Sequence, residues 1–374
     1  MIYLDYAATT PMDSRVLEAM MPYFKEEHGN PSSIHQFGQV TRRAIDEARN
    51  TVIEWLGAFS VHEIIFVGSG TESCNMAIFG AAFARQDQGK HIVVSAIEHP
   101  AVLESARYLR DNFGFKLTEV RPNSDGVIQV ADLEAALRDD TTLVSVMMAN
   151  NETGMIQPVK EIAALCRERG ILFHTDACQA PAYLPVRVDE IQPDLLTLNG
   201  AKIYGPKGVG LLYIREGVKI TPLVHGGGQE FRMRGGTENT ANIVGFAKAL
   251  ELIEDESERI GKLRDQLLDG LLSLPGVSLN GSRENRLANN VNIHVASFSG
   301  ETLVMRLDME GLAASSGSAC SSGKLEASHV LMAMGQSEEQ AKHSLRLSLG
   351  RFTTEAEIDQ AIELISKLVS VSNQ

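Results

Sequence analysis

Residues 63–84 read EIIFVGSGTESCNMAIFGAAFA, an apolar run that passes through a glycine-containing turn into a helical pattern. A strand followed by a helix at this spacing is half of a βαβ unit. The alternation continues as far as Tyr213, with further apolar runs at 91–96, 115–120, 141–149, 171–176, 194–199 and 208–214. We therefore expect an α/β fold built on a mostly parallel sheet that helices cover.

The C-terminal third of the chain has a different pattern. Apolar residues recur at helical spacing from Thr240 to Leu274, which predicts one long helix or two consecutive ones. A strand pattern at 289–295 and a closing helix, EAEIDQAIELISKLV, follow. A chain of 374 residues is too long for one ordinary hydrophobic core. We expect a large domain at 13–257 and a small C-terminal domain at 258–374, on which residues 1–12 pack.

Composition argues against several classes of function. The formal net charge of −14 disfavours nucleic acid as a direct ligand, since phosphate backbones need basic patches. No apolar run approaches the roughly 20 residues of a membrane span, and the start, MIYLDYAATTP, lacks the pattern of a signal peptide. We therefore expect a cytoplasmic protein without membrane contact. The cysteines are far apart and show no CxxC spacing, so neither a metal site nor a disulfide framework is indicated.

One thiol has unusual neighbours. Residues 313–323 read AASSGSACSSG, so Cys320 is flanked only by Ala, Ser and Gly. A structural cysteine usually packs among bulky apolar side chains, whereas a reactive one is accessible. We interpret Cys320 as a nucleophile carried on a loop.

Polar residues that follow the predicted strands are candidates for a ligand site, because ligands bind beyond the carboxyl ends of parallel strands. GSGTE (68–72) opens a helix and suits a phosphate group, since free backbone N–H groups collect there. Asp176 ends the run at 171–176, where a buried carboxylate needs a cation or hydrogen-bond donors. A protonated pyridine nitrogen would be such a cation. The simpler alternatives are that GSGTE forms an ordinary strand-to-helix turn and that Asp176 caps the next turn.

Three more residues follow predicted strands. Lys202 could form a Schiff base if it is partly desolvated, with Lys207 as the competing candidate and a surface charge as the alternative for both. His99 could stack on a flat ring and move protons, or could be a structural histidine. Asn150 could donate to a ring oxygen or occupy a turn. Together with GSGTE and Asp176, these positions indicate a cofactor site at one edge of the sheet.

The chain resembles the cysteine desulfurases, which belong to class V of the fold-type-I pyridoxal phosphate enzymes. The matching motifs cover nearly its whole length. They are, in order, YLDYAATTP, GNPSSIHQFG, GSGTESCNMAI, EHPAV, NNETG, HTDACQA, KIYGPKGVG, GGGQE, GGTEN, SSGSACSSGKLEASHVL and SLRLSLGRFTTEAEID.

The resemblance implies a seven-stranded sheet in the large domain, a smaller α/β domain, and pyridoxal 5′-phosphate as the cofactor. It implies that Lys202 holds the cofactor and moves a proton, that Cys320 attacks the substrate sulfur, and that His99 stacks and acts as acid or base. The other implied contacts are Asp176 at the pyridinium, Gln179 and Asn150 at the ring oxygen, Gly70, Thr71, Asn199 and Ala201 at the phosphate, Thr237 at the phosphate of the other subunit's cofactor, and Arg346 with Asn30 at the substrate carboxylate.

The implied activity is the conversion of L-cysteine to L-alanine by a homodimer. A persulfide forms on Cys320 and passes to an acceptor protein, such as an iron–sulfur scaffold or a tRNA-thiolation enzyme. Asn199 and Ala201 replace hydroxyl side chains that are usual in the family, which predicts weaker cofactor binding, and Phe231–Arg232 replaces a common Arg–Gly pair. The alternatives are an aminotransferase, a selenocysteine lyase, and a non-catalytic sulfur-relay protein that has lost its cofactor site.

Overall fold

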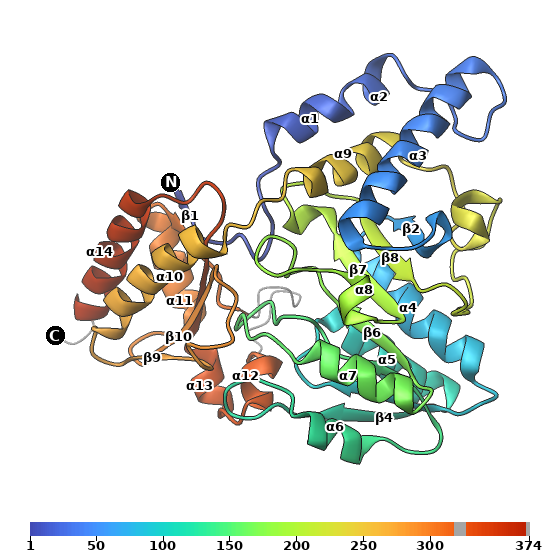
Figure 1. Ribbon diagram of the computed structural model, residues 1–374. Helices are drawn as coiled ribbons and strands as arrows, with labels where there is room; N and C mark the ends of the chain where they lie inside the picture. Colours follow the sequence, from blue (N-terminus) through green and yellow to red (C-terminus); the bar gives the residue numbers. More distant parts are fainter. Residues whose placement is uncertain (318–326, 372–374) are drawn as a thin grey trace.

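The computed structural model of the protein describes residues 1–317 and 327–371 (Figure 1). Its largest sheet has seven strands in the order β2-β8-β7-β6-β5-β3-β4. Strand β8 runs antiparallel to both of its neighbours, and every other pair in this sheet is parallel. The expected seven-stranded, mostly parallel sheet is therefore confirmed. Its strands are β2 Ile64–Val67, β3 His91–Ser95, β4 Lys116–Val120, β5 Thr141–Ser145, β6 Leu172–Asp176, β7 Leu195–Asn199 and β8 Gly210–Ile214.

Strand β5 is shorter than its apolar run predicts. The run continues to Ala149, but the strand ends at Ser145. Residues 146–149 still follow β6, because the Val146 N–H donates to the His174 carbonyl and the Met148 N–H to the Asp176 carbonyl. The apolar residues beyond the strand are buried, and Val146 and Met148 belong to the same hydrophobic core as Val144 of the strand.

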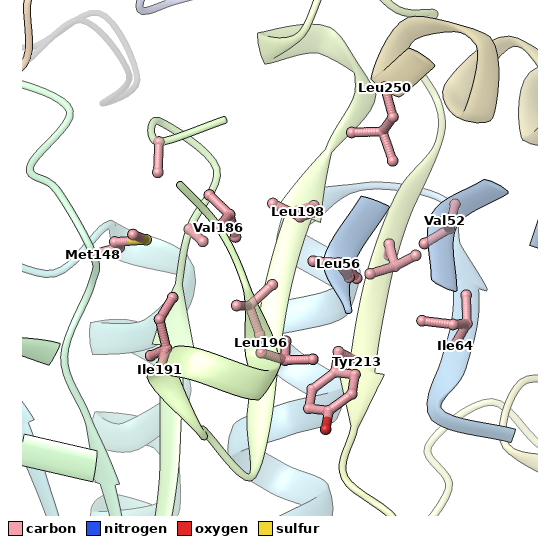
Figure 2. Close-up of a cluster of buried hydrophobic side chains, with 14 of the residues drawn as sticks. Val52, Leu56, Ile64, Met148, Val186, Ile191, Leu196, Leu198, Tyr213 and Leu250 are labelled. Atoms are coloured by element: carbon pink, nitrogen blue, oxygen red, sulfur yellow. The ribbon is translucent and has the colours of Figure 1, made fainter. Parts of the chain in front are cut away.

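Both faces of the sheet are covered, which explains its continuous apolar runs. In β2, Ile64 and Phe66 face one hydrophobic core, and Ile65 and Val67 face the other. Helices α4 and α5 pack on the second face, and α1, α3, α6, α7, α8 and α9 pack on the first. Figure 2 shows the first core, where Leu196 and Tyr213 of the sheet approach α3. The helices are α1 Ser14–Met20, α3 Gln36–Leu56, α4 Gly70–Arg85, α5 Pro100–Phe113, α6 Val130–Ala136, α7 Val159–Glu168, α8 Val188–Ile191 and α9 Thr240–Glu251.

The helical pattern from Thr240 to Leu274 forms two helices, α9 and α10 (Ser257–Leu272). Residues 252–256 between them belong to no helix or strand. In Figure 1, α10 lies in a separate part of the molecule together with α14 (Glu355–Val371). Two consecutive helices were one of the two possibilities that the sequence pattern predicted, and the structure shows this one.

A second, three-stranded sheet has the order β12-β10-β9 and its own hydrophobic core. Ile2 and Leu4 of the N-terminal segment belong to that core, and β1 pairs with β11. The separate cores favour the domain division at 257/258, which stays a prediction. The remaining elements are β1 Ile2–Tyr3, α2 Pro22–Lys25, β9 Val277–Leu279, β10 Asn290–Val295, α11 Gly300–Met309, β11 Leu312–Ala313, α12 His329–Ala333, α13 Glu338–Lys342 and β12 Ser344–Ser348.

Within the described part of the chain, no helix combines the length and the apolar character needed to cross a membrane.

Candidate active site

A cavity of about 680 Å³ lies at the carboxyl ends of the parallel strands. Its wall combines the N-terminal ends of α4 and α5, the ends of β6 and β7, the N-terminal segment, and Arg346 of β12. This is the edge at which the sequence predicts a ligand. Eight of the predicted site residues line it: Gly70, Thr71, His99, Asp176, Gln179, Asn199, Lys202 and Arg346.

Gly70 is the first residue of α4, whose N-terminus opens into this cavity. The first N–H groups of a helix have no partner within the helix and attract anions. A Cβ atom at Gly70 would lie 3.2 Å from atoms of both Asn199 and Cys178, which is tight. Glycine therefore leaves room for a group to approach the backbone, as a phosphate requires.

Asp176 ends β6 and is 8% exposed. Its Oδ1 accepts from the Cys178 N–H at 2.9 Å, and its Oδ2 lies 3.7 Å from the Cys74 thiol. No Lys or Arg of the described residues forms an ion pair with it. A buried carboxylate without a cation is costly, so this side chain fits a positively charged ligand atom such as a pyridinium nitrogen.

Lys202 ends the short helix Gly200–Lys202 that follows β7. Its Nζ donates to the carbonyl oxygens of Ala7 at 2.8 Å and Ala8 at 2.5 Å. Burial lowers the pKa of this amine, and the positive charge of Arg346 lowers it further, against the opposing effect of nearby Cys178 and Asp176. A lower pKa increases the fraction of neutral, nucleophilic amine.

His99 is the N-cap residue of α5, and its Nδ1 accepts a hydrogen bond from the Ala101 N–H at 3.1 Å. Burial lowers the pKa of His99, so the ring is neutral near pH 7. The preceding residue, Glu98, is fully buried, and burial raises its pKa to about 8. Its Oε1 accepts from Ser95 and from the Met147 N–H, which fixes the turn that carries His99.

Arg346 is 4% exposed and reaches the cavity from the second sheet. Its Nη2 pairs with Asp5 at 2.7 Å, and its Nη1 donates to the Asn151 carbonyl at 2.9 Å. Its Nε is buried without a hydrogen-bond partner among the described residues. A guanidinium with free N–H groups at a cavity can bind a carboxylate.

Asn150 differs from its expected role. The side chain is fully buried and is absent from the cavity wall. Its Nδ2 donates to the Ile97 carbonyl at 2.8 Å, and its Oδ1 accepts from the backbone N–H groups of Glu152 and Thr153. Asn150 thus holds its own loop together, and the neighbouring Asn151 lines the cavity instead.

Three other expected residues lie away from this wall. Asn30 is exposed in the loop before α3, where its Oδ1 accepts from the Ser32 N–H. The backbone groups of Ala201 are already used, because its carbonyl accepts from Thr10 and its N–H donates to Asn199. Thr237 is exposed in a loop before α9, and a contact with another subunit's cofactor stays a prediction. Cys320 lies outside the described residues, although Gly317 and Ala327 on either side of that gap line the cavity.

The wall also contains residues that the sequence interpretation did not name, among them Asp5, Asn151, Glu152 and His329. Asp5, Asn151 and Glu152 lie inside motifs quoted above, YLDYAATTP and NNETG, but only the fold shows which side chains face inward. His329 follows the segment that contains Cys320 and belongs to no strand end, so the strand-end rule could not find it. Among the described residues, no group of three or more His, Cys, Asp or Glu side chains is placed to hold a metal ion.

The residues at this cavity fit a phosphorylated pyridine cofactor. Asp176 supplies the missing counter-charge for a ring nitrogen, the N-terminus of α4 offers a phosphate site beside Gly70, and Lys202 supplies an amine. Asn199 lines the wall as a polar group at the place of a usual hydroxyl, and Ala201 contributes no side-chain donor.

Comparisons with known proteins agree with this chemistry. The family profile described as aminotransferase class-V matches residues 2–361. The chain is 48% identical to the cysteine desulfurase IscS of Dictyoglomus turgidum, over 98% of this chain and 94% of that protein. A solved structure described as a NifS-like protein superimposes with a TM-score of 0.92 at 36% identity and covers 99% of both chains. A structure described as SspA in complex with cysteine gives a TM-score of 0.84 at 36% identity, over 95% of this chain and all of that one.

A family match of this extent, with identity near one half over almost the whole chain, leaves no large region outside the resemblance. The chain therefore belongs to the class-V aminotransferase family, in its cysteine desulfurase branch.

Proposed function

We propose that this protein removes sulfur from L-cysteine, releases L-alanine, and leaves a persulfide on Cys320. The observation that carries the proposal is the set of three charges at one cavity. A lysine with a lowered pKa, a buried aspartate without a cation, and an arginine with free N–H groups face the same space. An amino acid bound to a pyridoxal cofactor needs each of these groups.

The cofactor in this proposal is pyridoxal 5′-phosphate. Lys202 would hold it covalently, Asp176 would pair with its ring nitrogen, and the N-terminus of α4 at Gly70 and Thr71 would bind its phosphate. Gln179, whose Nε2 donates to the Ala7 carbonyl, and Asn151 line the same wall and would hydrogen-bond its ring oxygen. When bound, the cofactor supplies an electron sink next to the Cα atom of the substrate.

The side chains of the protein would perform the other steps. Arg346 would bind the substrate carboxylate and so fix the orientation of the substrate sulfur. Lys202, once released by the incoming amine, would move the Cα proton. His99, held by the Ala101 N–H, would stack on the ring. Cys320 would attack the substrate sulfur as a thiolate, because the neutral thiol is a poor nucleophile.

Further features follow from the same proposal. The protein would act as a homodimer in the cytoplasm, with Thr237 at the phosphate of the partner subunit's cofactor. The persulfide would pass to an acceptor protein, either an iron–sulfur scaffold or a tRNA-thiolation enzyme. The IscS relatives and the cysteine complex of SspA support the choice of cysteine as substrate.

The test uses purified protein loaded with pyridoxal 5′-phosphate and supplied with L-cysteine, without any keto acid. Alanine is expected in each turnover, together with sulfide when a reductant is present. Cys320→Ala should keep the visible absorbance of the bound cofactor and lose nearly all sulfur release, whereas Lys202→Ala should lose that absorbance. Alanine that forms only after a keto acid is added would indicate an aminotransferase instead, and cysteine left unchanged by loaded protein would contradict the proposal.

A further inference from the structure

A second imidazole lines the cavity, and the steps described above do not use it. His329 is the first residue of α12 and lies in the cavity wall together with His99. Its Nε2 lies 3.0 Å from the backbone carbonyl oxygen of Glu98. That hydrogen bond joins α12 to the turn before α5, directly beside His99.

The hydrogen bond fixes which nitrogen of His329 carries the proton. A carbonyl oxygen can only accept, so Nε2 must donate. In the neutral ring Nδ1 then has a free lone pair. Nδ1 forms no hydrogen bond with the described residues, so His329 offers a proton acceptor to the cavity.

His99 has the opposite arrangement. Its Nδ1 accepts from the Ala101 N–H, which can only donate, so the proton of the neutral ring lies on Nε2. Burial lowers the pKa of His99 and keeps the ring neutral. His99 can therefore donate a hydrogen bond to a ligand, but its only lone pair is already used at the helix N-terminus.

The carboxyl groups near the two imidazoles each hold a cation, a hydrogen bond or a proton, and Glu104 of the cavity wall pairs with Arg107 at 2.9 Å. Glu98 has a pKa of about 8 because of burial, so it retains its proton at pH 7. Asp5 is paired with Arg346. Glu152 is 4% exposed, and its Oε2 accepts from the Ser328 hydroxyl. Asp176 and Lys202 are committed to the cofactor in the proposed function.

We propose that His329 is a catalytic residue of the sulfur-transfer step, in which its Nδ1 accepts the proton of the attacking thiol. The inference rests on the proposed function, which assigns that thiol to Cys320. The S–H bond breaks as the Nδ1–H bond forms, and the electron pair left on sulfur forms the S–S bond. The Cβ–S bond of the substrate breaks in the same step, and its electron pair stays on Cβ. The imidazolium then returns the proton to Cβ, which becomes the methyl carbon of alanine.

The decisive variant is His329→Gln, because the amide nitrogen of Gln can still donate to the Glu98 carbonyl while Gln has no basic nitrogen. General-base catalysis contributes about 10²–10⁴-fold in rate. We expect kcat for alanine release to fall by about 100-fold, with the KM for cysteine and the cofactor absorbance unchanged. If the hydrogen bond to Glu98 were the only role of His329, this variant would retain kcat within about threefold and the proposal would be wrong.

The second variant, His329→Ala, loses both functions and leaves space for an external base. Imidazole added to this variant should raise the rate of alanine release in proportion to the concentration of its neutral form. The matched control is His329→Gln, in which the larger side chain leaves no such space and no acceleration is expected. A rate for His329→Ala that is independent of imidazole would overturn the assignment.

Alanine formation by the wild-type protein distinguishes a failure of the proposed function from a failure of the His329 assignment. If loaded wild-type protein forms alanine from cysteine, the proposed function stands, and the His329 variants test only the base. If it forms none, the proposed function itself fails, whatever the variants do.

Discussion

Arg346 and Arg351 lie five residues apart in the same motif, and both pair with an aspartate of the N-terminal segment. Arg351 uses all three nitrogens: Nε donates to Glu256 at 2.8 Å, Nη1 to Asp13 at 3.2 Å and Nη2 to the Leu252 carbonyl at 2.8 Å. Its guanidinium also lies 4.4 Å from the ring centre of Tyr204. Arg346 leaves Nε without a partner in the described residues and lines the cavity.

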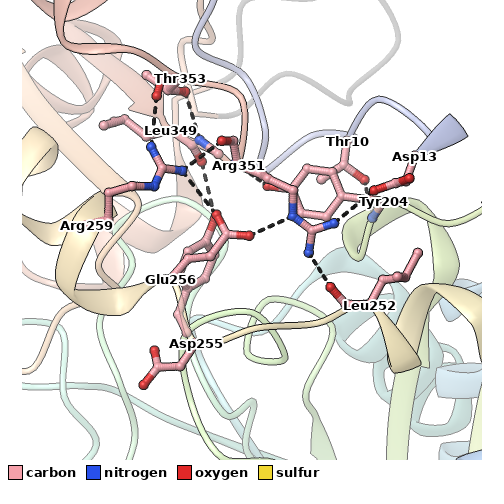
Figure 3. Close-up of polar contacts among 12 residues, drawn as sticks. Thr10, Asp13, Tyr204, Leu252, Asp255, Glu256, Arg259, Leu349, Arg351 and Thr353 are labelled. Carbon is pink, nitrogen blue, oxygen red and sulfur yellow. Dashed lines mark hydrogen bonds and ion pairs between the residues drawn. The ribbon is translucent and has the colours of Figure 1, made fainter. Parts of the chain in front are cut away.

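The difference separates a structural cation from a ligand-binding one. Figure 3 shows Arg351 surrounded by groups from the N-terminal segment, the Lys202 turn and the segment between α9 and α10. The backbone N–H of Arg351 also donates to the Tyr204 hydroxyl at 2.6 Å. The contacts of Arg351 therefore include the turn that carries Lys202. Arg351 directs three of its five N–H groups at protein atoms and is not part of the cavity wall, whereas Arg346 lines the cavity and uses only two.

The largest effect should come from Arg351→Met. Removing Arg351 leaves Glu256 with Arg259 alone and Asp13 with Arg15 alone, and frees the Leu252 carbonyl. Loss of one partner from a buried network costs up to about 3–5 kcal/mol. We expect the free energy of unfolding to fall by that amount in urea denaturation, with kcat/KM of the remaining folded protein nearly unchanged. Arg259→Met is the control, because that side chain is 49% exposed and its loss should cost less than about 1 kcal/mol. Equal losses in the two variants would contradict the structural role.

Arg346→Gln should have the opposite effect, with a large loss of activity and a smaller loss of stability. A charge-assisted hydrogen bond to a carboxylate contributes about 1.5–3 kcal/mol, so kcat/KM for cysteine should fall by about 100-fold, mainly through KM. Stability should change less than in Arg351→Met, because the remaining Asp5 side chain is 22% exposed and can be hydrated. Arg346→Lys, which keeps the charge but loses the planar fork, should lie between. An unchanged KM in both variants would assign Arg346 to structure alone.

A smaller effect concerns pH and Asp13, the carboxylate partner of Arg351. Its hydrogen bond to Arg15, helped by the charge of Arg351, lowers the pKa of Asp13 to about 2 in the folded protein. The folded state binds this proton more weakly than the unfolded chain. The stabilisation is therefore complete above about pH 4 and is lost as the pH falls toward 2. Asp13→Asn should weaken the decrease of Tm over this window, and Asp46→Asn, an exposed carboxylate on α3, should not.

The smallest expected effect is a gain in stability at Arg232, which belongs neither to the cavity wall nor to the Arg351 network. Glu230, Phe231 and Arg232 all have positive φ, at 44°, 55° and 68°. Glu230 is fixed by buried Arg49 and by the Phe66 N–H, so it defines this bend at the edge strand β2. Arg232→Gly should raise the free energy of unfolding by about 1 kcal/mol, since glycine adopts positive φ without strain. Arg232→Ala is the control and should give no gain. A loss in Arg232→Gly would mean that the side chain stabilises the bend.

The sequence predicted the strands of the large sheet and eight residues of the cavity wall, because strand ends of a parallel sheet meet at one edge. It failed where two neighbouring residues compete for one role. Asn150 and Asn151 have the same chemistry, and only the backbone hydrogen bonds of the loop decide that the first is buried and the second faces the cavity. Asn30 lies before α3, away from this chain's cavity wall, and its role at the substrate carboxylate stays a prediction.

The sequence by itself determined the α/β class, the order of the strands along the chain, and the presence of Lys202, Asp176, His99 and Cys320 in motifs of one enzyme family. These follow from local periodicity and from residue types at fixed spacing. The tertiary structure alone decided which arginine lines the cavity, which nitrogen of His329 carries its proton, and that His329 shares a cavity with His99. The contacts of His329 and of Arg346 join segments far apart in the chain, and no local pattern records them.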